Sequence, residues 1–390
     1  MPPMPRSVPK LAALAGVLFL LLVLFVLGPP LWTRYLDALA RRSVMLYQPR
    51  ELLGGGNEPP APRVLPGTEL LDPRALEEAA RYAGEHGAQA LIVSRHDHIV
   101  FERYWRGSSF TTLIDAGTFT PLLAALATGH ALSHRQLGWP DEPVGILLPE
   151  WANDPRGAIT VRNLLQFSSG LAPSGPADDP YDLAASLMAR VLAVPPGSRR
   201  LEQPADPQLL ALVLQKGTRE RYASYVSQTI WRPIGAGDAW LWLDHPGGTP
   251  HADCCLISRQ GDWIRIGELL LRDGNYRGDE LMRPGWIAVM RSPARSDPDF
   301  GMFLRLGSRP APGQESYAAR DVFVAGGADG NRLWVVPSLG IVVLRTGSAM
   351  QAAAGWDDAR IPNLVIRGAR DYLPPAALPG ADLSSIVPGH

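Results

Sequence analysis

The sequence predicts an α+β protein in which the two ends of one domain share an antiparallel sheet and the middle forms an inserted, mainly helical lobe. A transmembrane helix is expected to precede this domain. Three observations predict the arrangement: strand-like runs occur early and late in the chain, helical patterns fill the stretch between them, and one long apolar run stands near the N-terminus. The seam between the two lobes is where we expect a cleft.

Composition excludes several classes of protein. The chain has 390 residues, 46% of them apolar, which is enough for a sizeable core. Its 37 basic and 38 acidic side chains are balanced, so we expect no nucleic-acid partner. Its 2 cysteines exclude a disulfide scaffold and a Cys-rich zinc site, and we expect neither a metal nor a cofactor. Lysine is confined to Lys10 and Lys216, which limits any mechanism that needs a lysine in a cleft.

The apolar run from Leu11 to Leu27 is interrupted only by Gly16. With the residues up to 32 it reaches the roughly 17–25 residues that a membrane span needs. We therefore assign 1–10 as a cytoplasmic tail and 11–32 as a single-pass anchor. A cleavable signal peptide is the alternative, but its apolar region is about 7–15 residues long with a small-x-small site close behind. Basic residues flank both sides of the span, and its early position favours a body on the extracytoplasmic (periplasmic) side.

Residues 33–69 read as a neck and a Pro/Gly linker, because Gly54–Gly56 is followed by three closely spaced prolines. A helix is expected over Arg74–Glu85, after Asp72-Pro73. Two strand-like runs, Ala90–Ser94 and His98–Tyr104, then form a hairpin.

The next segments predict a buried helix and then a long helical middle. The pattern over Thr118–Leu132 is apolar on all sides. Further elements are helices at Leu209–Lys216, Ala223–Thr229, Asp262–Arg272 and Ile361–Tyr372, and strands at Asp321–Ala325, Arg332–Val336 and Ile341–Arg345. We place the domain at 70–368, with a sheet lobe (70–110 and 300–368), a helical lobe (111–299) and a C-terminal tail (369–390).

Several short motifs, in order, carry a resemblance to a known family. Asp97–Trp105 resembles the second-strand signature of the serine β-lactamase/penicillin-binding-protein superfamily, and is most similar to its class C-like branch of esterases and 6-aminohexanoate-dimer hydrolases. Further motifs of that branch are matched by Leu148–Trp151, Ile159–Leu165, Ser168–Leu171, Pro195–Ser198, Ile230–Gly235 and Val335–Gly340. The resemblance implies a β-lactamase/transpeptidase-like fold.

The resemblance also implies acyl transfer by a serine that a lysine one helical turn later activates (S-x-x-K). The family's S-x-x-K-S-F-T-S aligns with residues 114–121, where Phe119 and Thr120 fix the register. The serine position is then Ile114 and the lysine position is Gly117. Isoleucine has no hydroxyl and glycine has no base.

Two other family positions complete the comparison. The family's tyrosine position falls on Glu202. The late segment that begins Ala325, Gly326 and Gly327 resembles the family's A-x-G-x-x-G-Q, and a small-residue segment of this kind leaves a backbone N–H free for an oxyanion.

We weigh three hypotheses. The first is a pseudoenzyme whose cleft binds a peptide, a cell-wall-like fragment or a protein partner. The second is an amide or ester hydrolase with replacement residues, in which Asp115 and Glu202 act as general acid and base and Thr118 offers a hydroxyl. Simpler roles for the same residues are that Asp115 caps the following helix and that Glu202 pairs with Arg199 or Arg200. The third is an envelope scaffold held to the membrane by its anchor.

Two smaller motifs contain residue types that are found in metal or redox sites. For the adjacent Cys254-Cys255 we expect two free thiols rather than a disulfide. His130 and His134 have the spacing of metal ligands, but we expect loop histidines because Gly129 interrupts the helical pattern.

Overall fold

The computed structural model describes residues 44–173, 180–307, 313–348 and 355–371. The chain divides into two compact units, 1–49 and 50–390, and the second unit is the body described below. The predicted tail (1–10) and anchor (11–32) lie outside the described residues, as do residues 372–390 of the predicted C-terminal tail. Within the described part of the chain, no helix combines the length and the apolar character that a membrane crossing requires.

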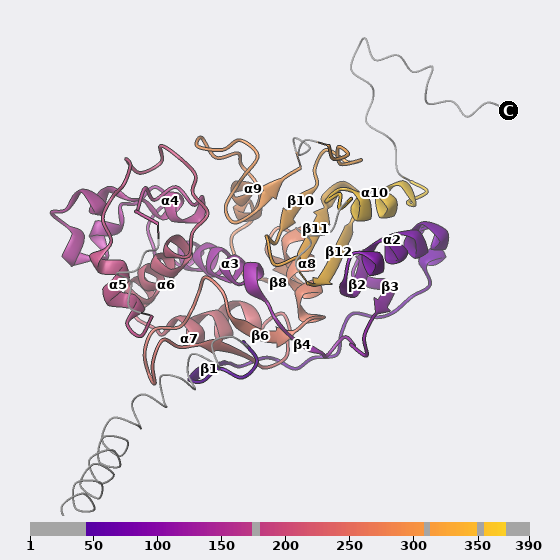
Figure 1. Ribbon diagram of the computed structural model, residues 1–390, viewed down its shortest axis with the longest axis horizontal. Helices are drawn as coiled ribbons and strands as arrows, with labels where there is room; N and C mark the ends of the chain where they lie inside the picture. The colour runs from indigo at the N-terminus through magenta and orange to yellow at the C-terminus, as the bar shows by residue number, and fades with distance from the viewer. Residues whose placement is uncertain (1–43, 174–179, 308–312, 349–354, 372–390) are drawn as a thin grey trace, which may run out of the picture. The chain divides into compact units, whose positions relative to one another are not determined.

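A six-stranded antiparallel sheet joins the early and late strands, as predicted (Figure 1). Its order is β3-β2-β12-β11-β10-β9. The strands are β2 (Ala88–Arg95), β3 (His98–Tyr104), β9 (Arg305–Leu306), β10 (Phe323–Ala325), β11 (Arg332–Val336) and β12 (Ile341–Gly347). Val93 of β2 lies opposite Val343 of β12, so segments 250 residues apart in sequence are neighbours in the sheet.

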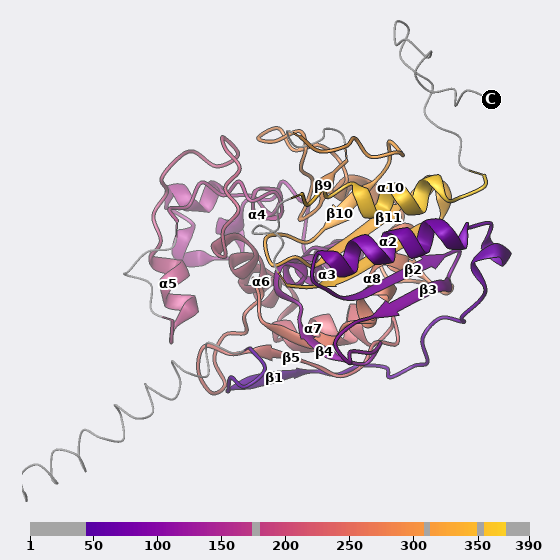
Figure 2. The ribbon, with the colours of Figure 1, turned by 45° about the vertical axis from the view of Figure 1, so that its right-hand side comes forward.

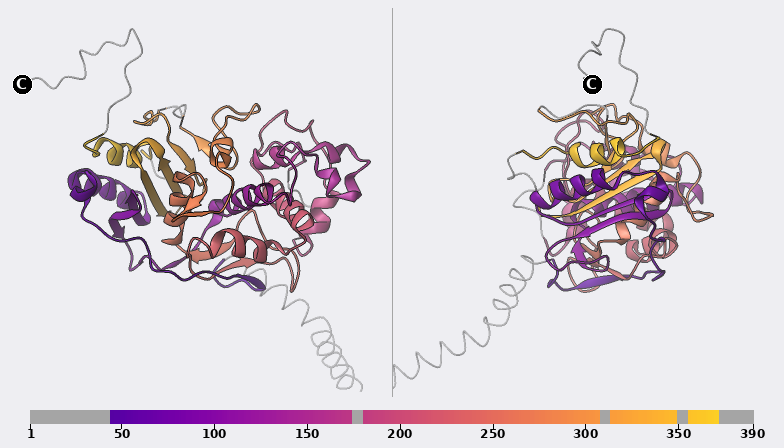
Figure 3. Two further views of the ribbon diagram at one scale, coloured as in Figure 1. Left: turned by 180° about the vertical axis from the view of Figure 1, so that it is seen from behind. Right: turned by 90° about the vertical axis from the view of Figure 1, so that its right-hand side faces the viewer.

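Helices cover both faces of this sheet (Figures 2 and 3). Alternate side chains of a strand point to opposite faces. On β2, Leu91 and Val93 pack in a core with α2 (Pro73–Glu85) and α10 (Arg360–Arg367), whereas Ala90 and Ile92 belong to the core that contains α8 (Asp262–Leu271). The sheet lobe therefore has three layers, of which α8 was predicted to belong to the helical lobe (111–299). That boundary is wrong, because α8 packs on β11 and β12.

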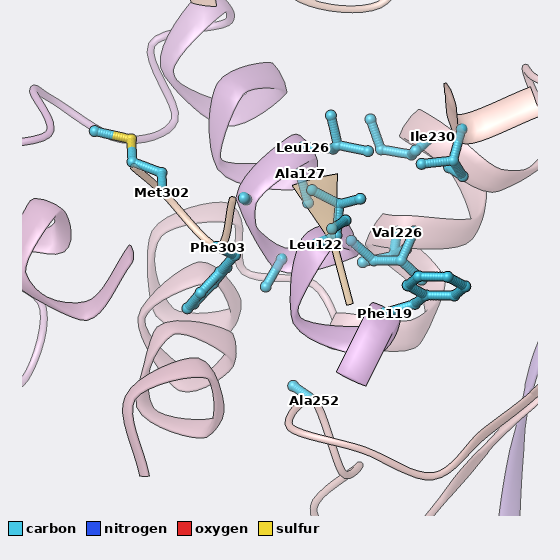
Figure 4. Close-up of a cluster of buried hydrophobic side chains, with 14 of the residues drawn as sticks. Phe119, Leu122, Leu126, Ala127, Val226, Ile230, Ala252, Met302 and Phe303 are labelled. Carbon is cyan, nitrogen blue, oxygen red and sulfur yellow. The ribbon is translucent and has the colours of Figure 1, made fainter. Parts of the chain in front are cut away.

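The remaining helices and α3 (Thr120–Ser133) make up the helical lobe, and residues 120 to 129 of α3 are all buried. Figure 4 shows part of this core, where Phe119, Leu122 and Leu126 lie near Val226 and Ile230. These helices are α4 (Val161–Leu165), α5 (Leu183–Ala189), α6 (Ala205–Thr218), α7 (Tyr222–Val226) and α9 (Trp286–Met290), with a π-helical turn at Ser227–Trp231.

The body also contains two smaller sheets that the sequence did not predict. A four-stranded sheet has the order β1-β5-β6-β4, and β7 pairs with β8. The strands are β1 (Arg50–Leu53), β4 (Leu113–Asp115), β5 (Ala239–Trp242), β6 (Leu256–Arg259), β7 (Asn275–Tyr276) and β8 (Asp279–Glu280). They are short, and too few residues alternate for a period of two to stand out.

The predicted neck and linker (33–69) is wrong for residues 50–69, which belong to the body. Strand β1 belongs to the four-stranded sheet, and η1 (Pro66–Glu69) is a 3₁₀ helix. Gly55 N–H donates to Asp238 Oδ1 at 2.9 Å, and the Glu58 carbonyl accepts from Arg265. The glycines therefore serve close packing and not flexibility: a β-carbon on Gly55 would overlap the backbone of residues 236–237.

Candidate functional site

The turn that leads into α3 is held by the carboxylate of Asp115. Strand β4 ends at Asp115, and Asp115 Oδ1 accepts a hydrogen bond from Gly117 N–H at 2.9 Å. Gly117 has φ +49°, in the left-handed region where a β-carbon is strained. The 3₁₀ turn η2 (Gly117–Phe119) then continues into α3. Burial raises the pKa of Asp115, the Gly117 hydrogen bond opposes this, and the neighbouring charge of Asp329 adds to it.

A second carboxylate, that of Asp329, clamps the same turn from the sheet side. Asp329 Oδ2 accepts from Thr118 N–H at 2.9 Å, and Asp329 Oδ1 accepts from Thr118 Oγ1 at 2.7 Å. The Asn331 amide donates to Asp329 Oδ2 at 3.0 Å and to the Asp115 carbonyl at 3.3 Å. A β-carbon on Gly117 would overlap Asp329 Oδ2. The Asp329 carboxylate thus fills the space into which a side chain at position 117 would extend.

A cavity of about 190 Å³ lies beside this turn, between the sheet lobe and the helical lobe. Three of the predicted site residues line it: Thr118, Glu202 and Gly326. The other lining residues include the charged side chains Asp253 and Arg305 and the aromatic side chains Phe167, Phe300 and Phe303. The expected cleft at the seam of the two lobes is therefore present.

The other predicted site residues do not line this cavity. Ile114 is only 7% exposed and lies in β4 opposite Ser258. Gly117 and Asp115 are turned toward the Asp329 side of the turn, and Ala325 is buried in β10. A β-carbon on Gly327 would contact the Thr118 side chain, so Gly327 closes the turn from the sheet side.

Glu202 forms an ion pair with Arg200 at 2.6 Å. The Arg200 guanidinium also lies 3.8 Å from the centre of the Phe300 ring. Phe300 and Arg305 line both the first cavity and a second one of about 450 Å³, whose lining includes Trp356. The two cavities are therefore neighbours that share part of their walls.

The cavity lining lacks the side chains of Ser-Lys-Tyr chemistry. Among the described residues that line the 190 Å³ cavity, none is a serine, lysine, tyrosine or histidine. Lys216 lies on the last turn of α6 and is exposed. Thr118 is the one hydroxyl side chain among these lining residues.

Sequence reasoning missed three residues of this region: Asp329, Asn331 and Asp253. Asp329 and Asn331 lie within the segment that the sequence analysis noted for its glycines. The polar Asp-Gly-Asn triplet in that segment was the local feature that could have marked them as site residues. The contact that gives Asp329 its role spans 211 residues of sequence, and no local pattern reports it.

Two predictions on the smaller motifs are corrected. Cys254 and Cys255 form a disulfide between adjacent residues, with a Cα–Cα distance of 3.7 Å, whereas we expected free thiols. His130 lies within α3, which continues through Gly129, and the missing β-carbon of Gly129 leaves room for the Trp286 ring. The rings of His130 and His134 stack at 4.0 Å, and burial lowers the pKa of His130 to about 4.

An antiparallel sheet between helices, with a cleft beside the first turn of a buried helix, defines the class of β-lactamase/penicillin-binding-protein-like folds. The sequence model of the family described as "Beta-lactamase" matches residues 74–351. The chain therefore belongs to the beta-lactamase family.

Individual relatives are more distant. A curated protein of Escherichia coli (strain K12) named "Putative D-alanyl-D-alanine carboxypeptidase" is 25% identical over 178 residues, which are 37% of this chain and 41% of the relative. The chain thus aligns with about two-fifths of that relative's length.

Solved structures share the fold. The "Putative 6-aminohexanoate-dimer hydrolase from Bacillus anthracis" superposes with a TM-score of 0.66 at 16% identity, covering 84% of this chain and 90% of that one. A penicillin-binding protein homologue from Caulobacter crescentus superposes with a TM-score of 0.61 at 17% identity, covering 76% and 97%. These likenesses establish the α+β, β-lactamase/transpeptidase-like fold.

Proposed function

We propose that the body is a non-catalytic binding protein of the beta-lactamase family, and that its cleft holds a peptide or a cell-wall-like fragment. The observation that carries this proposal is the clamp of Asp329 on the turn before α3. The clamp places a hydrogen-bonded carboxylate beside Gly117, where the family alignment puts a lysine.

The residue identities support the same conclusion. In the alignment, Ile114 stands at the serine position, Gly117 at the lysine position and Glu202 at the tyrosine position. A serine hydroxyl needs a neighbouring base to act as a nucleophile, and here both the hydroxyl and the base are missing. Restoring a lysine at position 117 would also require Asp329 to move.

The cleft has the chemistry of a peptide-binding site. Arg305 and the Glu202 and Asp253 carboxylates offer both signs of charge, and three phenylalanines supply apolar contact. A short peptide carries both a carboxylate and amide or ammonium groups, which matches this lining. The name of the Escherichia coli relative also refers to an enzyme that acts on a peptide.

The test combines covalent probes with binding. Purified protein is treated with a fluorescent penicillin and with a fluorophosphonate, and we expect no covalent labelling by either. Isothermal titration with synthetic cell-wall stem peptides should detect binding that Arg305→Gln weakens. Arg74→Gln, an exposed arginine on α2 outside the cleft, is the matched control and should bind as the wild type does. A penicillin or fluorophosphonate adduct on any serine of the body would overturn the proposal.

The second candidate is a hydrolase that uses replacement residues, and one observation favours it. Thr118 lines the cavity and donates its hydroxyl hydrogen to Asp329 at 2.7 Å, which is the contact of a nucleophile with a base. Asp115 and Glu202 are weaker candidates, because one holds the Gly117 amide and the other pairs with Arg200. A fluorophosphonate adduct on Thr118 that Thr118→Val abolishes and the exposed control Thr111→Val retains would favour this candidate.

We further propose that residues 11–32 anchor the protein in the membrane once, with the body on the periplasmic side. The length of the apolar run supports this proposal. Carbonate extraction of membranes should leave the full chain in the pellet, and protease added to spheroplasts should digest the body. The envelope-scaffold alternative would gain support if the anchored body bound no peptide.

A further inference from the structure

We propose that His251, Cys254 and Cys255 form a redox-gated site for a soft divalent metal ion. The site is closed while the two cysteines form their disulfide and opens when a dithiol reductant converts them to thiols. This inference does not rest on the function proposed for the cleft.

His251 and Cys254 already lie at nearly the distance that a shared metal ion would require, whereas the two sulfur atoms are bonded to each other and separate only when the disulfide is reduced. His251 Nδ1 is 3.9 Å from Cys254 Sγ, and the three potential ligand atoms lie within 4.8 Å of one another. With metal–sulfur and metal–nitrogen bonds of about 2.0–2.3 Å, ligand atoms on one tetrahedral ion are about 3.5–4 Å apart. Thiolate and imidazole are ligand types that zinc and soft divalent ions such as cadmium prefer.

The loop that carries these residues is fixed at both ends. Gln208 on α6 donates to the Pro250 carbonyl at 2.7 Å and accepts from Ala252 N–H at 2.8 Å. Strand β6 begins at Leu256, directly after the cysteines, and the Leu256 carbonyl accepts from Ala116 N–H at 2.8 Å. Because the backbone is held on each side, opening the disulfide leaves the ligands gathered.

The His251 imidazole contacts Cys254 and one carboxylate, that of Asp253. His251 Nδ1 lies 3.4 Å from Asp253 Oδ1, and Asp253 lines the cavity beside Thr118. Within the described residues, His251 Nε2 is buried and has no hydrogen-bond partner. We assign the Asp253 carboxylate, which contacts the same imidazole, as a fourth ligand, so occupancy of the metal site would change the charge of the cleft wall.

A dithiol reductant opens the Cys254–Cys255 disulfide in two exchange steps. One thiolate of a dithiol reductant attacks Cys254 Sγ, which is more exposed than Cys255, and the S–S bond breaks with release of the Cys255 thiolate. The second thiol of the reductant then displaces Cys254 from the mixed disulfide and leaves as part of a cyclic disulfide. Two electrons pass from the reductant to the protein. A metal ion that binds both thiols releases two protons.

The test uses the full chain and cadmium as the probe. Protein is reduced with a dithiol, freed of reductant without air, and titrated with Cd²⁺, beside oxidised protein handled in the same way. We expect one Cd²⁺ per reduced chain, with the ultraviolet charge-transfer band of cadmium thiolates, and no such band for oxidised protein. Near-ultraviolet circular dichroism of the two forms checks that the reduced chain stays folded.

Variants then assign the ligands. Cys254→Ser should abolish the band, and His251→Ala should weaken binding by about tenfold or more. His245→Ala, an exposed histidine that hydrogen-bonds the Tyr181 carbonyl, is the matched control and should bind as the wild type does. Equal cadmium binding by oxidised and reduced protein would overturn the proposal. Unchanged affinity of His251→Ala would also overturn it, since the site would then be a dithiol alone.

Discussion

At the scale of single residues, the pairing of Gly117 with Asp329 defines the site. Two features favour glycine at position 117: its φ of +49° lies in the left-handed region that side chains rarely adopt, and its missing β-carbon leaves room for Asp329 Oδ2. The carboxylate in turn accepts from the Thr118 amide and hydroxyl. The turn is thus stabilised in a form that excludes a side chain at position 117.

Gly117→Ala should destabilise the protein by about 1–3 kcal/mol from the backbone conformation alone, with a further loss from overlap with Asp329. Gly107→Ala isolates the first contribution, because Gly107 has φ +72° and open space around it. Urea denaturation of both variants measures the difference. If the two lose equal stability, Asp329 does not fill the space beside position 117.

At the scale of elements, α6 is attached to the loop after α4 by a buried carboxylate. Asp206 is 0% exposed and accepts from Ser169 Oγ at 2.6 Å and from Gln203 at 3.2 Å. Burial raises the pKa of Asp206 from 3.8 to about 7, and the hydrogen bonds from Ser169 and Gln203 oppose this rise. The folded chain therefore holds a proton on Asp206 at pH values where the unfolded chain has lost it.

The pH dependence of stability follows from this difference. Between pH 3.8 and about 7 the native state binds the extra proton, so the contribution of Asp206 to the free energy of unfolding falls as the pH rises. The expected slope is up to about 1.4 kcal/mol per pH unit. Denaturation at a series of pH values should show a flatter dependence for Asp206→Asn than for the wild type. Asp279→Asn, an exposed carboxylate on β8, should keep the wild-type slope.

Elements with a clear period could be predicted from the sequence, and those defined by distant partners could not. The β2–β3 hairpin and α3 were predicted to within two residues at each end, because alternation and continuous apolar character are local properties. Strands β1 and β4 were missed because each is short and exists through pairing with β5 or β6. The disulfide was also missed: Cys255 adopts φ +66°, a backbone conformation that the residue sequence does not reveal.

At the scale of the whole molecule, the body includes the glycine-rich segment that composition assigned to a flexible spacer. Gly54–Gly56 lies against residues 232–237, and β1 extends the four-stranded sheet. Composition alone does not separate a glycine that gives flexibility from one that allows close approach.

The cleft could also be predicted only in part from the sequence. Its position at the seam was predictable from the order of strands and helices, but its charged lining depends on contacts between distant segments.

Gly55→Ala tests the revised boundary. The new methyl group would overlap the Ala236 carbonyl and the backbone of Gly237, and we expect a loss of about 1–3 kcal/mol in the free energy of unfolding. Gly67→Ala is the control, because nothing lies within 4 Å of its added β-carbon. A spacer that stood free of the body would tolerate both substitutions equally.

The place of β12 between β2 and β11 has a consequence for biosynthesis. During translation the β2–β3 hairpin leaves the ribosome long before Ile341, so one edge of β2 stays unpaired while most of the body is made. A nascent chain truncated before β12 should therefore be digested readily by protease, and resistance should arise in one step when β12 emerges. The emergence of β12 thus completes the six-stranded sheet, and α10 follows it to pack against α2.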